Sequence, residues 1–229
     1  MSGPYRIGFL LWPGLTQLDM TGPAQVLSRM PGAELHYAWK SVEPIPSDCG
    51  LSLMPTVSLA DCPQLDILCV PGGAPVAPIM RDADVLAWLR AQAAGAEFVT
   101  SVCTGSLILA AAGLLHGYKA GCYWASGHQL PLFGAEFVEE RVVFDRNRIT
   151  AGGVTSGIDF AFRLIEHKLG RNLAEEVQLG LEYDPQPVAG GTLRTARPEI
   201  VDRVRALMAQ RIAAREAEII EIARHFQPS

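Results

Sequence analysis

The sequence has no run of basic residues and no long apolar segment, and each absence excludes a class of protein. The 19 Lys and Arg residues are outnumbered by 24 Asp and Glu residues, which gives a formal net charge of −5. Nothing therefore favours nucleic-acid binding through phosphate contacts, or docking on an anionic membrane. No stretch reaches the roughly 18 apolar residues that would cross a bilayer. We expect neither a nucleic-acid nor a membrane partner.

Cysteines are few and are not arranged in pairs. The chain has five of them, and none forms a Cys-x-x-Cys pair. An odd, unpaired set is typical of reduced thiols, and no His or Cys spacing indicates a zinc site. The amino-terminal residues also lack the cleavage site of a secretory signal. We therefore expect a cytoplasmic protein without a metal. The cysteines are Cys49, Cys62, Cys69, Cys103 and Cys122.

Short apolar runs alternate with helical patterns over the first 170 residues, within an ordinary globular composition. The alternation predicts an α/β fold, a mostly parallel sheet covered by helices on both faces. A segment rich in Pro, Ser and Asp at 43–64 predicts a hairpin and loops. Strands are expected at 5–11, 35–41, 65–73 (a run that ends in Pro-Gly-Gly), 96–102 and, as a pair, 141–150; helices are expected at 17–30, 82–94, 106–115 and within 151–170.

Glycine-rich turns follow three of the predicted strands, after residue 11, at 71–73 and at 103–105. In open α/β sheets, ligand sites lie at the carboxyl ends of the strands. The glycines at 152, 153 and 157 are candidates to line the same crevice.

The tail differs from the body. Residues 194–225 carry apolar side chains at helical spacing behind Pro198. We predict one α/β domain at 1–190 and a helical extension at 191–229 that packs on the same domain or on a second subunit.

Cys103 ends an apolar run and is followed directly by Thr104, Gly105 and Ser106. This order predicts a sharp strand-to-helix elbow, which would expose the sulfur above the sheet. A helix amino terminus and free N–H groups would favour a reactive thiolate. The alternative is that Cys103 is a small buried apolar residue, as most free cysteines are.

Asp19 is the first candidate for a proton partner of Cys103, because it follows the first strand and so reaches the same end of the sheet. Its alternative role is to cap the following helix, which Thr21 could share. Among the histidines, only His128 has a plausible loop position, and nothing directs it toward Cys103.

Four segments, GFLLWPGLTQLDMTGP, DILCVPGG, VTSVCTGSLILAAAGLL and ITAGGVTSGIDFA, resemble the ThiJ/PfpI superfamily, the class I glutamine amidotransferase-like group with a flavodoxin-type fold. Within it, the match is closest to the bacterial isocyanide (isonitrile) hydratases. The resemblance covers most of residues 5–185. It implies a homodimer, no cofactor and a cysteine on a nucleophile elbow. By position it implies Cys103 as the nucleophile, Asp19 as the acid/base, and Thr104, Gly72, Gly73, Gly153 and Val154 as oxyanion- or substrate-binding residues.

One departure concerns the histidine that many superfamily members carry after the elbow helix. This chain has Cys122 and Tyr123 before Trp124 at that point, so the Cys–His pair of hydrolytic members is not available. The departure weakens a protease or amidase interpretation, but it leaves a mechanism based on cysteine and aspartate intact.

The resemblance therefore implies hydration of a small-molecule isocyanide to an N-substituted formamide, through a thioimidate on Cys103 with Asp19 as acid/base. Three alternatives remain open. One is a glyoxalase- or deglycase-like enzyme, one is a non-enzymatic sensor related to the domain of AraC-type regulators, and one is a redox sensor that uses the same thiol.

Overall fold

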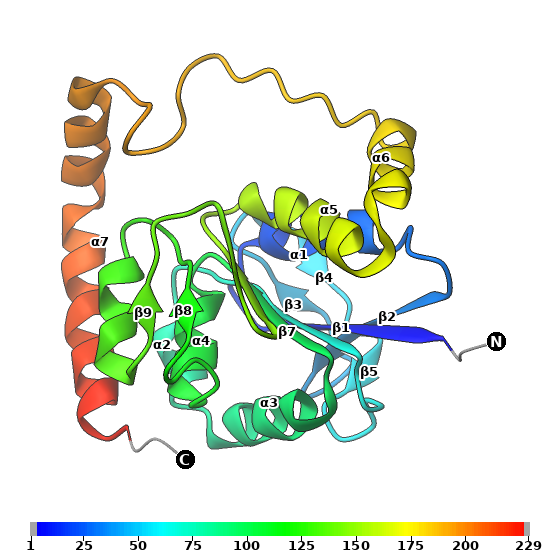
Figure 1. The fold of residues 1–229 in the computed structure, drawn as a ribbon. Coiled ribbons are helices and arrows are strands. Elements are labelled where there is room, and N and C mark those ends of the chain that lie inside the picture. The colour runs from blue at the N-terminus through cyan, green and yellow to red at the C-terminus, as the bar shows by residue number, and fades with distance from the viewer. Residues whose placement is uncertain (1–3, 227–229) are drawn as a thin grey trace.

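A central sheet with helices on both faces dominates the computed structural model, which describes residues 4–226 (Figure 1). Its seven strands follow the order β10-β11-β7-β6-β1-β2-β5. Neighbouring strands run parallel, except in the antiparallel β10–β11 hairpin at one edge. The predicted α/β fold is confirmed. The bounds are β1 Tyr5–Leu10, β2 Ala33–Trp39, β5 Val57–Ser58, β6 Ile67–Val70, β7 Phe98–Val102, β10 Val142–Asp145 and β11 Arg148–Ala151.

The helices form two layers around this sheet (Figure 1). One face carries α1 (Gln17–Leu27) and α5 (Ser156–Leu169), with α6 (Arg171–Gly180) packed on α5. The other face carries α3 (Ala83–Gly95) and α4 (Gly105–Ala111), with the short α2 (Ala77–Met80) beside them. Outside this second layer, the 3₁₀ helix η1 (Gly127–Phe133) contacts α4, and α7 (Pro198–Arg224) contacts η1 and α2.

Several local predictions are confirmed. Strands β3 (Ile45–Pro46) and β4 (Ser52–Leu53) form the hairpin expected within 43–64. The carboxylate of Asp82 caps α3 by accepting the Val85 N–H at 3.2 Å. Three helices were not predicted: the short α2, η1 and α6. Pro131 interrupts the helical pattern of η1, and α6 begins directly after Gly170, which reads as a helix end. A small parallel pair, β8 (Lys119–Ala120) and β9 (Glu136–Phe137), completes the structure.

The core lies on both sides of the central strands. All residues of β6 and β7 are buried, as the apolar runs predicted for a sheet covered on both faces. Trp12 and Leu15 are fully buried and therefore belong to this core rather than to a pocket.

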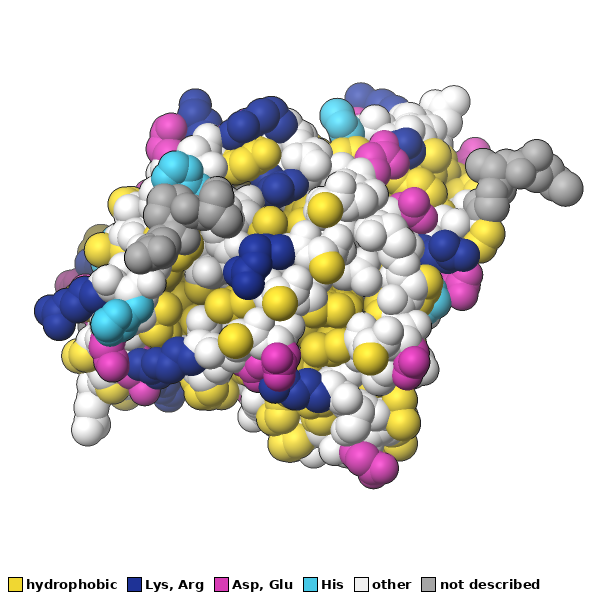
Figure 2. All heavy atoms as spheres, turned by 90° about the horizontal axis from the view of Figure 1, so that it is seen from below, with side chains coloured by type: hydrophobic (Ala, Val, Ile, Leu, Met, Phe, Trp, Pro, Cys, Tyr) yellow, Lys and Arg dark blue, Asp and Glu magenta, His cyan; other side chains and the backbone are white. Residues whose placement is uncertain are grey.

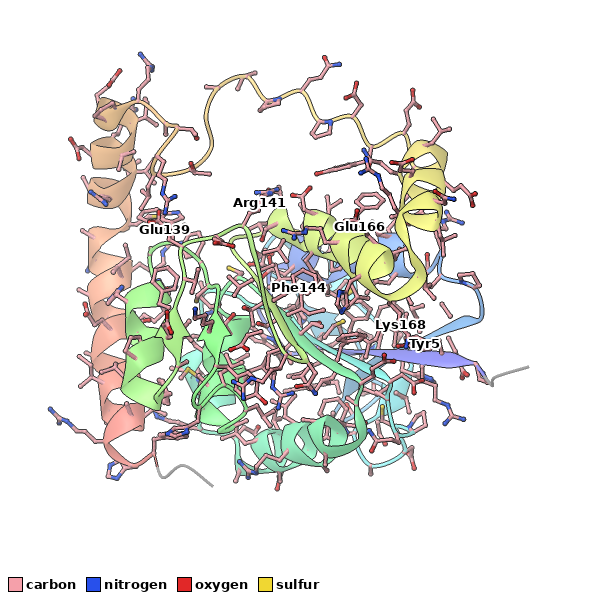
Figure 3. All side chains as sticks on the ribbon, viewed as in Figure 1. Tyr5, Glu139, Arg141, Phe144, Glu166 and Lys168 are labelled. Carbon is pink, nitrogen blue, oxygen red and sulfur yellow. The ribbon has the colours of Figure 1, made fainter. Side chains whose placement is uncertain are left out.

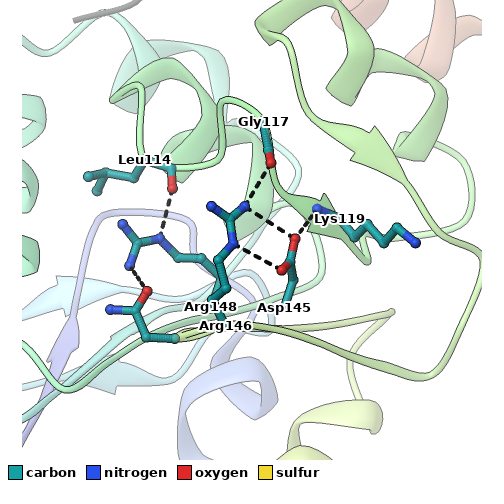
Figure 4. A network of polar contacts seen from close by, with 7 residues as sticks. Leu114, Gly117, Lys119, Asp145, Arg146 and Arg148 are labelled. Atoms are coloured by element: carbon teal, nitrogen blue, oxygen red, sulfur yellow. Dashed lines mark hydrogen bonds and ion pairs between the residues drawn. The ribbon is translucent and has the colours of Figure 1, made fainter.

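Polar contacts tie the sheet to its surroundings. Glu97, which directly precedes β7, accepts hydrogen bonds from Tyr5 in β1 and Lys168 in α5, both labelled in Figure 3. At the β10–β11 edge, Arg146 donates to Asp145 and to the Gly117 carbonyl at 2.7 Å, and Arg148 donates to the Leu114 carbonyl at 2.8 Å (Figure 4). These contacts hold the β10–β11 hairpin against the segment that follows α4.

The surface carries charges of both signs. On the face seen in Figure 2, Lys and Arg side chains are interspersed with Asp and Glu. No helix within residues 4–226 is long and apolar enough to span a membrane. In the same range, no group of three or more His, Cys, Asp or Glu side chains is placed to hold a metal ion.

The segment before α7 is largely exposed, and α7 itself contacts the body with only part of its length. Ile219 is fully buried, and the ring of Phe226 packs against Phe133 of η1 with centroids 5.3 Å apart. The apolar side chains nearer the start of α7 are exposed, for example Leu207 at 75%. The apolar pattern of the tail is therefore only partly used for packing on the body. The boundary at residue 190 between the α/β domain and the helical extension stays a prediction.

Candidate active site

Cys103 sits on the strand-to-helix elbow that the sequence predicted. β7 ends at Val102 and α4 begins at Gly105, so the chain reverses within two residues. Cys103 has a φ of +62°, a left-handed conformation that is strained for a residue with a side chain. Its N–H donates to the Gly152 carbonyl at 2.8 Å, which anchors the elbow to the segment after β11.

Close packing explains the glycines around the elbow. A Cβ on Gly105 would overlap the carbonyl of Val70, the last residue of β6. A Cβ on Gly72 would lie 2.5 Å from the Thr104 nitrogen. The chain therefore needs glycine at both positions to bring the ends of β6 and β7 together.

Asp19 lies in the first turn of α1, with only 1% of its surface exposed. Its Oδ2 accepts the Gly72 N–H at 2.9 Å. Its Oδ1 makes no hydrogen bond of regular geometry within residues 4–226, so that oxygen is available to the Cys103 thiol. The two side chains interact, because a hydrogen bond from the thiol is among the influences on the Asp19 pKa. Thr16, rather than Asp19, occupies the cap position of α1.

Burial disfavours charge on both members of this pair. It raises the pKa of Asp19 to about 7, and the hydrogen bonds from Gly72 and Cys103 only partly oppose the rise. Burial, followed by the Asp19 charge, raises the Cys103 pKa well above its ordinary value. The expected helix effect does not dominate, so the resting thiol is neutral. Its proton can leave only if a neighbouring group accepts it, and Asp19 is the carboxylate in contact.

Backbone donors surround the sulfur. The N–H groups of Thr104 and Val154 both interact with it and oppose the rise of its pKa. Val154 has a φ of +34°, which is unusual for a β-branched residue. These two amides are positioned to stabilise negative charge on the sulfur or on an atom bound to it.

The amides of Gly72 and Gly73 lie at the elbow, but both N–H groups already donate hydrogen bonds to protein side chains. The Gly72 N–H donates to Asp19, and the Gly73 N–H donates to Thr104 Oγ1 at 2.9 Å. Thr104 Oγ1 in turn donates to the Gly73 carbonyl at 2.8 Å. Both glycines and the Thr104 side chain therefore fix the positions of Asp19 and the elbow.

Tyr123 forms a wall beside the elbow. Its N–H donates to the Cys103 carbonyl at 3.3 Å, and its ring would lie 2.8 Å from a Cβ on Gly153. Its hydroxyl donates to Met208 Sδ of α7 at 3.6 Å. Tyr123 thus links the elbow, the segment after β11 and the C-terminal helix. His128 lies elsewhere and pairs with Glu216 of α7.

A cavity of about 590 Å³ adjoins this wall. Tyr123, Gly153 and Val154 line it, together with Trp124 and residues 191–195. Arg141, which pairs with Asp159 at the start of α5, lies on its rim (Figure 3). Cys103 is 6% exposed and is not among the residues that line this cavity. Tyr123 and Val154 line the cavity and also contact Cys103.

Comparison with protein families identifies the group to which this architecture belongs. The sequence profile described as the DJ-1/PfpI family matches residues 5–167, which include the elbow, Asp19 and the segment after β11. The chain belongs to the DJ-1/PfpI family. The predicted superfamily membership is therefore confirmed.

Two DJ-1/PfpI relatives match nearly the whole chain. The isonitrile hydratase of Pseudomonas putida is 49% identical over 217 residues, covering 94% of this chain and 95% of that protein. The crystal structure of a ThiJ/PfpI family protein from Pseudomonas syringae superposes with a TM-score of 0.91 at 39% identity, covering 96% of this chain and 91% of that one.

Other relatives match a smaller part of this chain. The crystal structure of Drosophila melanogaster DJ-1beta superposes with a TM-score of 0.70 at 26% identity, covering 81% of this chain and 100% of that one. The HTH-type transcriptional regulator GbdR of Pseudomonas aeruginosa is 30% identical over 190 residues, covering 79% of this chain but only 51% of that protein.

Proposed function

We propose that this protein is an isonitrile hydratase that converts R–NC and water to the formamide R–NH–CHO. The similarity to the Pseudomonas putida isonitrile hydratase along nearly the whole chain carries this proposal. The contact between the Cys103 thiol and the Asp19 carboxyl supplies a nucleophile and a proton carrier for the reaction.

In the first step, Asp19 takes the thiol proton and Cys103 Sγ attacks the terminal carbon of the isonitrile. That carbon becomes a carbanion, which receives the same proton back from Asp19, and a thioimidate, R–N=CH–S–Cys103, forms. An aspartate whose pKa is raised to about 7 can both accept and return a proton near neutral pH. The amides of Thr104 and Val154 stabilise the sulfur as it loses its proton.

In the second step, water adds to the thioimidate carbon. Asp19 takes a proton from the water and passes it to the substrate nitrogen, which gives R–NH–CH(OH)–S–Cys103. The C–S bond then breaks, the hydroxyl proton returns to the sulfur through Asp19, and the formamide leaves. Atoms balance, and no external oxidant or reductant is needed. Dividing the addition into two steps is the advantage of covalent catalysis.

The test measures formation of the formyl proton signal by NMR when the protein is incubated with cyclohexyl isocyanide. We expect turnover by the wild type and a loss of at least about 1000-fold in Cys103→Ala, because removal of a nucleophile has effects of this order. Cys49→Ala changes an exposed cysteine and is expected to behave like the wild type. Equal rates for wild type and Cys103→Ala would contradict the proposal.

The similarity to GbdR supports a second candidate, a ligand-sensing role like that of a regulator domain. The same assay separates the two, because a sensor would bind an isonitrile without forming the formamide. Methylglyoxal, tested in parallel, addresses glyoxalase activity. We also propose that the protein acts as a homodimer.

A further inference from the structure

A buried arginine in α7 has no ion-pair partner within residues 4–226. Arg215 is 7% exposed, and its Nε and Nη2 make no hydrogen bond to any described residue. These two nitrogens share one edge of the guanidinium, the edge that binds a carboxylate through two parallel N–H···O bonds. A buried guanidinium without a partner is unfavourable, so its retention indicates an anionic ligand.

Two more buried polar side chains lie at the start of η1, the element that α7 contacts: one at its cap position and one within it. Ser126 and Gln129 are 0% and 1% exposed, and the Ser126 hydroxyl and both Gln129 amide atoms have no hydrogen-bond partner among the described residues. The Gln129 N–H donates to the Ser126 carbonyl at 3.0 Å, which closes one 3₁₀ turn. The Ser126 N–H donates to the Tyr123 carbonyl at 2.8 Å, so the start of η1 adjoins the Tyr123 segment.

A side-chain contact joins η1 and α7 at this point. His128 Nε2 lies 3.3 Å from Glu216 Oε1. Gln129 and Arg215 directly neighbour these two residues in the sequence, and both are buried. Polar groups without partners therefore occur on both elements of the η1–α7 contact: a guanidinium edge on α7, and an amide and a hydroxyl at the start of η1. This set of mostly hydrogen-bond donors suits an oxyanion.

The charge of Arg215 also acts on the residues beside the elbow. Burial raises the Cys122 pKa to about 12, and Arg215 is one of the groups that oppose this rise. Burial and then Cys103 raise the Tyr123 pKa, and Arg215 and Arg211 oppose them. The arginine therefore lies close to the Cys122–Tyr123 segment that forms the wall next to Cys103.

We propose that Arg215, Gln129 and Ser126 form a binding site for a small carboxylate. The guanidinium edge binds both carboxylate oxygens, and the Gln129 amide and Ser126 hydroxyl donate to their remaining lone pairs. Two sources share this chemistry: a carboxylate substituent on the isonitrile, and a separate small carboxylic acid.

The first test uses the intact wild-type protein and ¹³C-acetate at constant ionic strength balanced with sodium chloride. We expect the protein to broaden the acetate NMR signal and acetate to raise Tm in a saturable manner. Acetamide, a neutral ligand of the same size, is expected to do neither. The absence of an acetate response, or equal responses to acetate and acetamide, would overturn the proposal.

Matched variants then locate the site. Arg215→Lys keeps the charge but loses the bidentate edge, so acetate binding is expected to weaken about tenfold or more. Arg211→Gln changes an exposed arginine one turn earlier on the same face of α7, and this variant is expected to bind like the wild type. Equal weakening of acetate binding in both variants would indicate a general electrostatic attraction to the positive charges of α7, and would overturn the proposed site. If Arg215→Lys does not fold, Gln129→Leu and Ser126→Ala replace it. Unchanged acetate binding in both of these variants would also overturn the proposed site.

The source of the carboxylate is decided in the isonitrile assay, and this part alone rests on the proposed function. An acetate-dependent increase in KM at unchanged kcat identifies the substrate's carboxylate as the natural ligand. A Tm shift without any change in KM identifies a separate ligand. The NMR test needs no turnover, so failure of the proposed activity is distinguishable from failure of this site.

Discussion

At the scale of single residues, Cys103 and Asp19 share one buried environment that cannot hold two negative charges. Burial raises both pKa values, and the Asp19 charge raises the pKa of Cys103 further. The pair therefore carries at most one negative charge, with one proton between sulfur and carboxylate. An electrophile that bonds to the sulfur leaves this proton on Asp19, where the proposed reaction needs it.

The raised pKa of Asp19 predicts a pH-dependent cost to folding. Its folded value is about 7, against 3.8 for the free group, so the folded state binds more protons between these values. Stability from this group is present below about pH 4 and is lost as the pH rises to about 7. Each pKa unit corresponds to about 1.4 kcal/mol, so the full difference is roughly 4 kcal/mol.

Asp19→Asn removes the ionisation and is expected to stabilise the protein at pH 8, by up to this amount, and to have little effect at pH 4. Urea unfolding at the two pH values measures the difference. Asp184→Asn, the same change at an exposed position, is expected to be neutral at both. A difference between wild type and Asp19→Asn that does not change with pH would refute this account.

The turn glycines predict a second residue-scale effect. Gly105→Ala introduces a Cβ that overlaps the Val70 carbonyl, so we expect a loss of at least about 1–3 kcal/mol in unfolding free energy. Gly180→Ala is the control, because a Cβ there meets nothing within 4 Å. At the end of α6, alanine is expected to be neutral or slightly stabilising. Chemical denaturation of both variants checks the contrast, and similar values for the two would be inconsistent with it.

At the scale of elements, α7 is the part of the structure that connects the tail to the elbow. Its inner face contacts η1, and Met208 accepts the hydrogen bond of the Tyr123 hydroxyl. A shift of α7 would therefore displace Tyr123, which contacts both Cys103 and Gly153. This arrangement makes the helix part of the surroundings of the active site.

The packing of α7 on the body depends on few buried apolar side chains. Substitutions in its two halves are therefore expected to differ strongly in their effect on the free energy of unfolding. Ile219→Ala removes a fully buried side chain and is expected to destabilise the protein by about 2–5 kcal/mol. Leu207→Ala changes a residue that is 75% exposed and is expected to cost less than about 0.5 kcal/mol. Limited proteolysis and urea unfolding measure both effects. A large effect of Leu207→Ala in a monomeric preparation would contradict the packing described.

At the scale of the whole molecule, the parallel sheet brings four distant segments to one edge. Asp19 follows β1, Gly72 follows β6, Cys103 follows β7 and Val154 follows β11. These strands are neighbours in the order β11-β7-β6-β1, so their carboxyl ends meet. The site therefore depends on the sheet topology more than on any local motif.

The proposed homodimer is a prediction at this scale. Light scattering coupled to gel filtration should give twice the chain mass of 24.7 kDa. The exposed apolar residues near the start of α7, Ile200, Val204 and Leu207, offer surface for a second copy. A mass equal to one chain across a range of concentrations would exclude the homodimer.

Local patterns in the sequence determined most of the secondary structure and the elbow. Apolar runs identified the buried central strands, Asp82 marked the start of α3, and the order of Cys103, Thr104 and Gly105 marked a reversal of the chain. Such features depend on neighbours in the sequence, which is why they can be read without coordinates. Helix η1 could not be predicted in this way, since Pro131 interrupts its pattern and its packing on α4 and α7 stabilises it.

Only the tertiary structure decided which groups of the site contact one another and which hydrogen bonds they make. The sequence offered Asp19 as a partner for Cys103, but their contact depends on the order of the strands. The amides of Gly72 and Gly73 were expected to face a ligand, and the fold instead directs them to Asp19 and Thr104. Burial outweighs the effect of the helix amino terminus on the Cys103 pKa. In the sequence, Arg215 is one of several arginines of its helix, and only the packing shows that it is buried. Burial and hydrogen-bond partners arise from contacts between distant segments, and the sequence of one segment does not encode them.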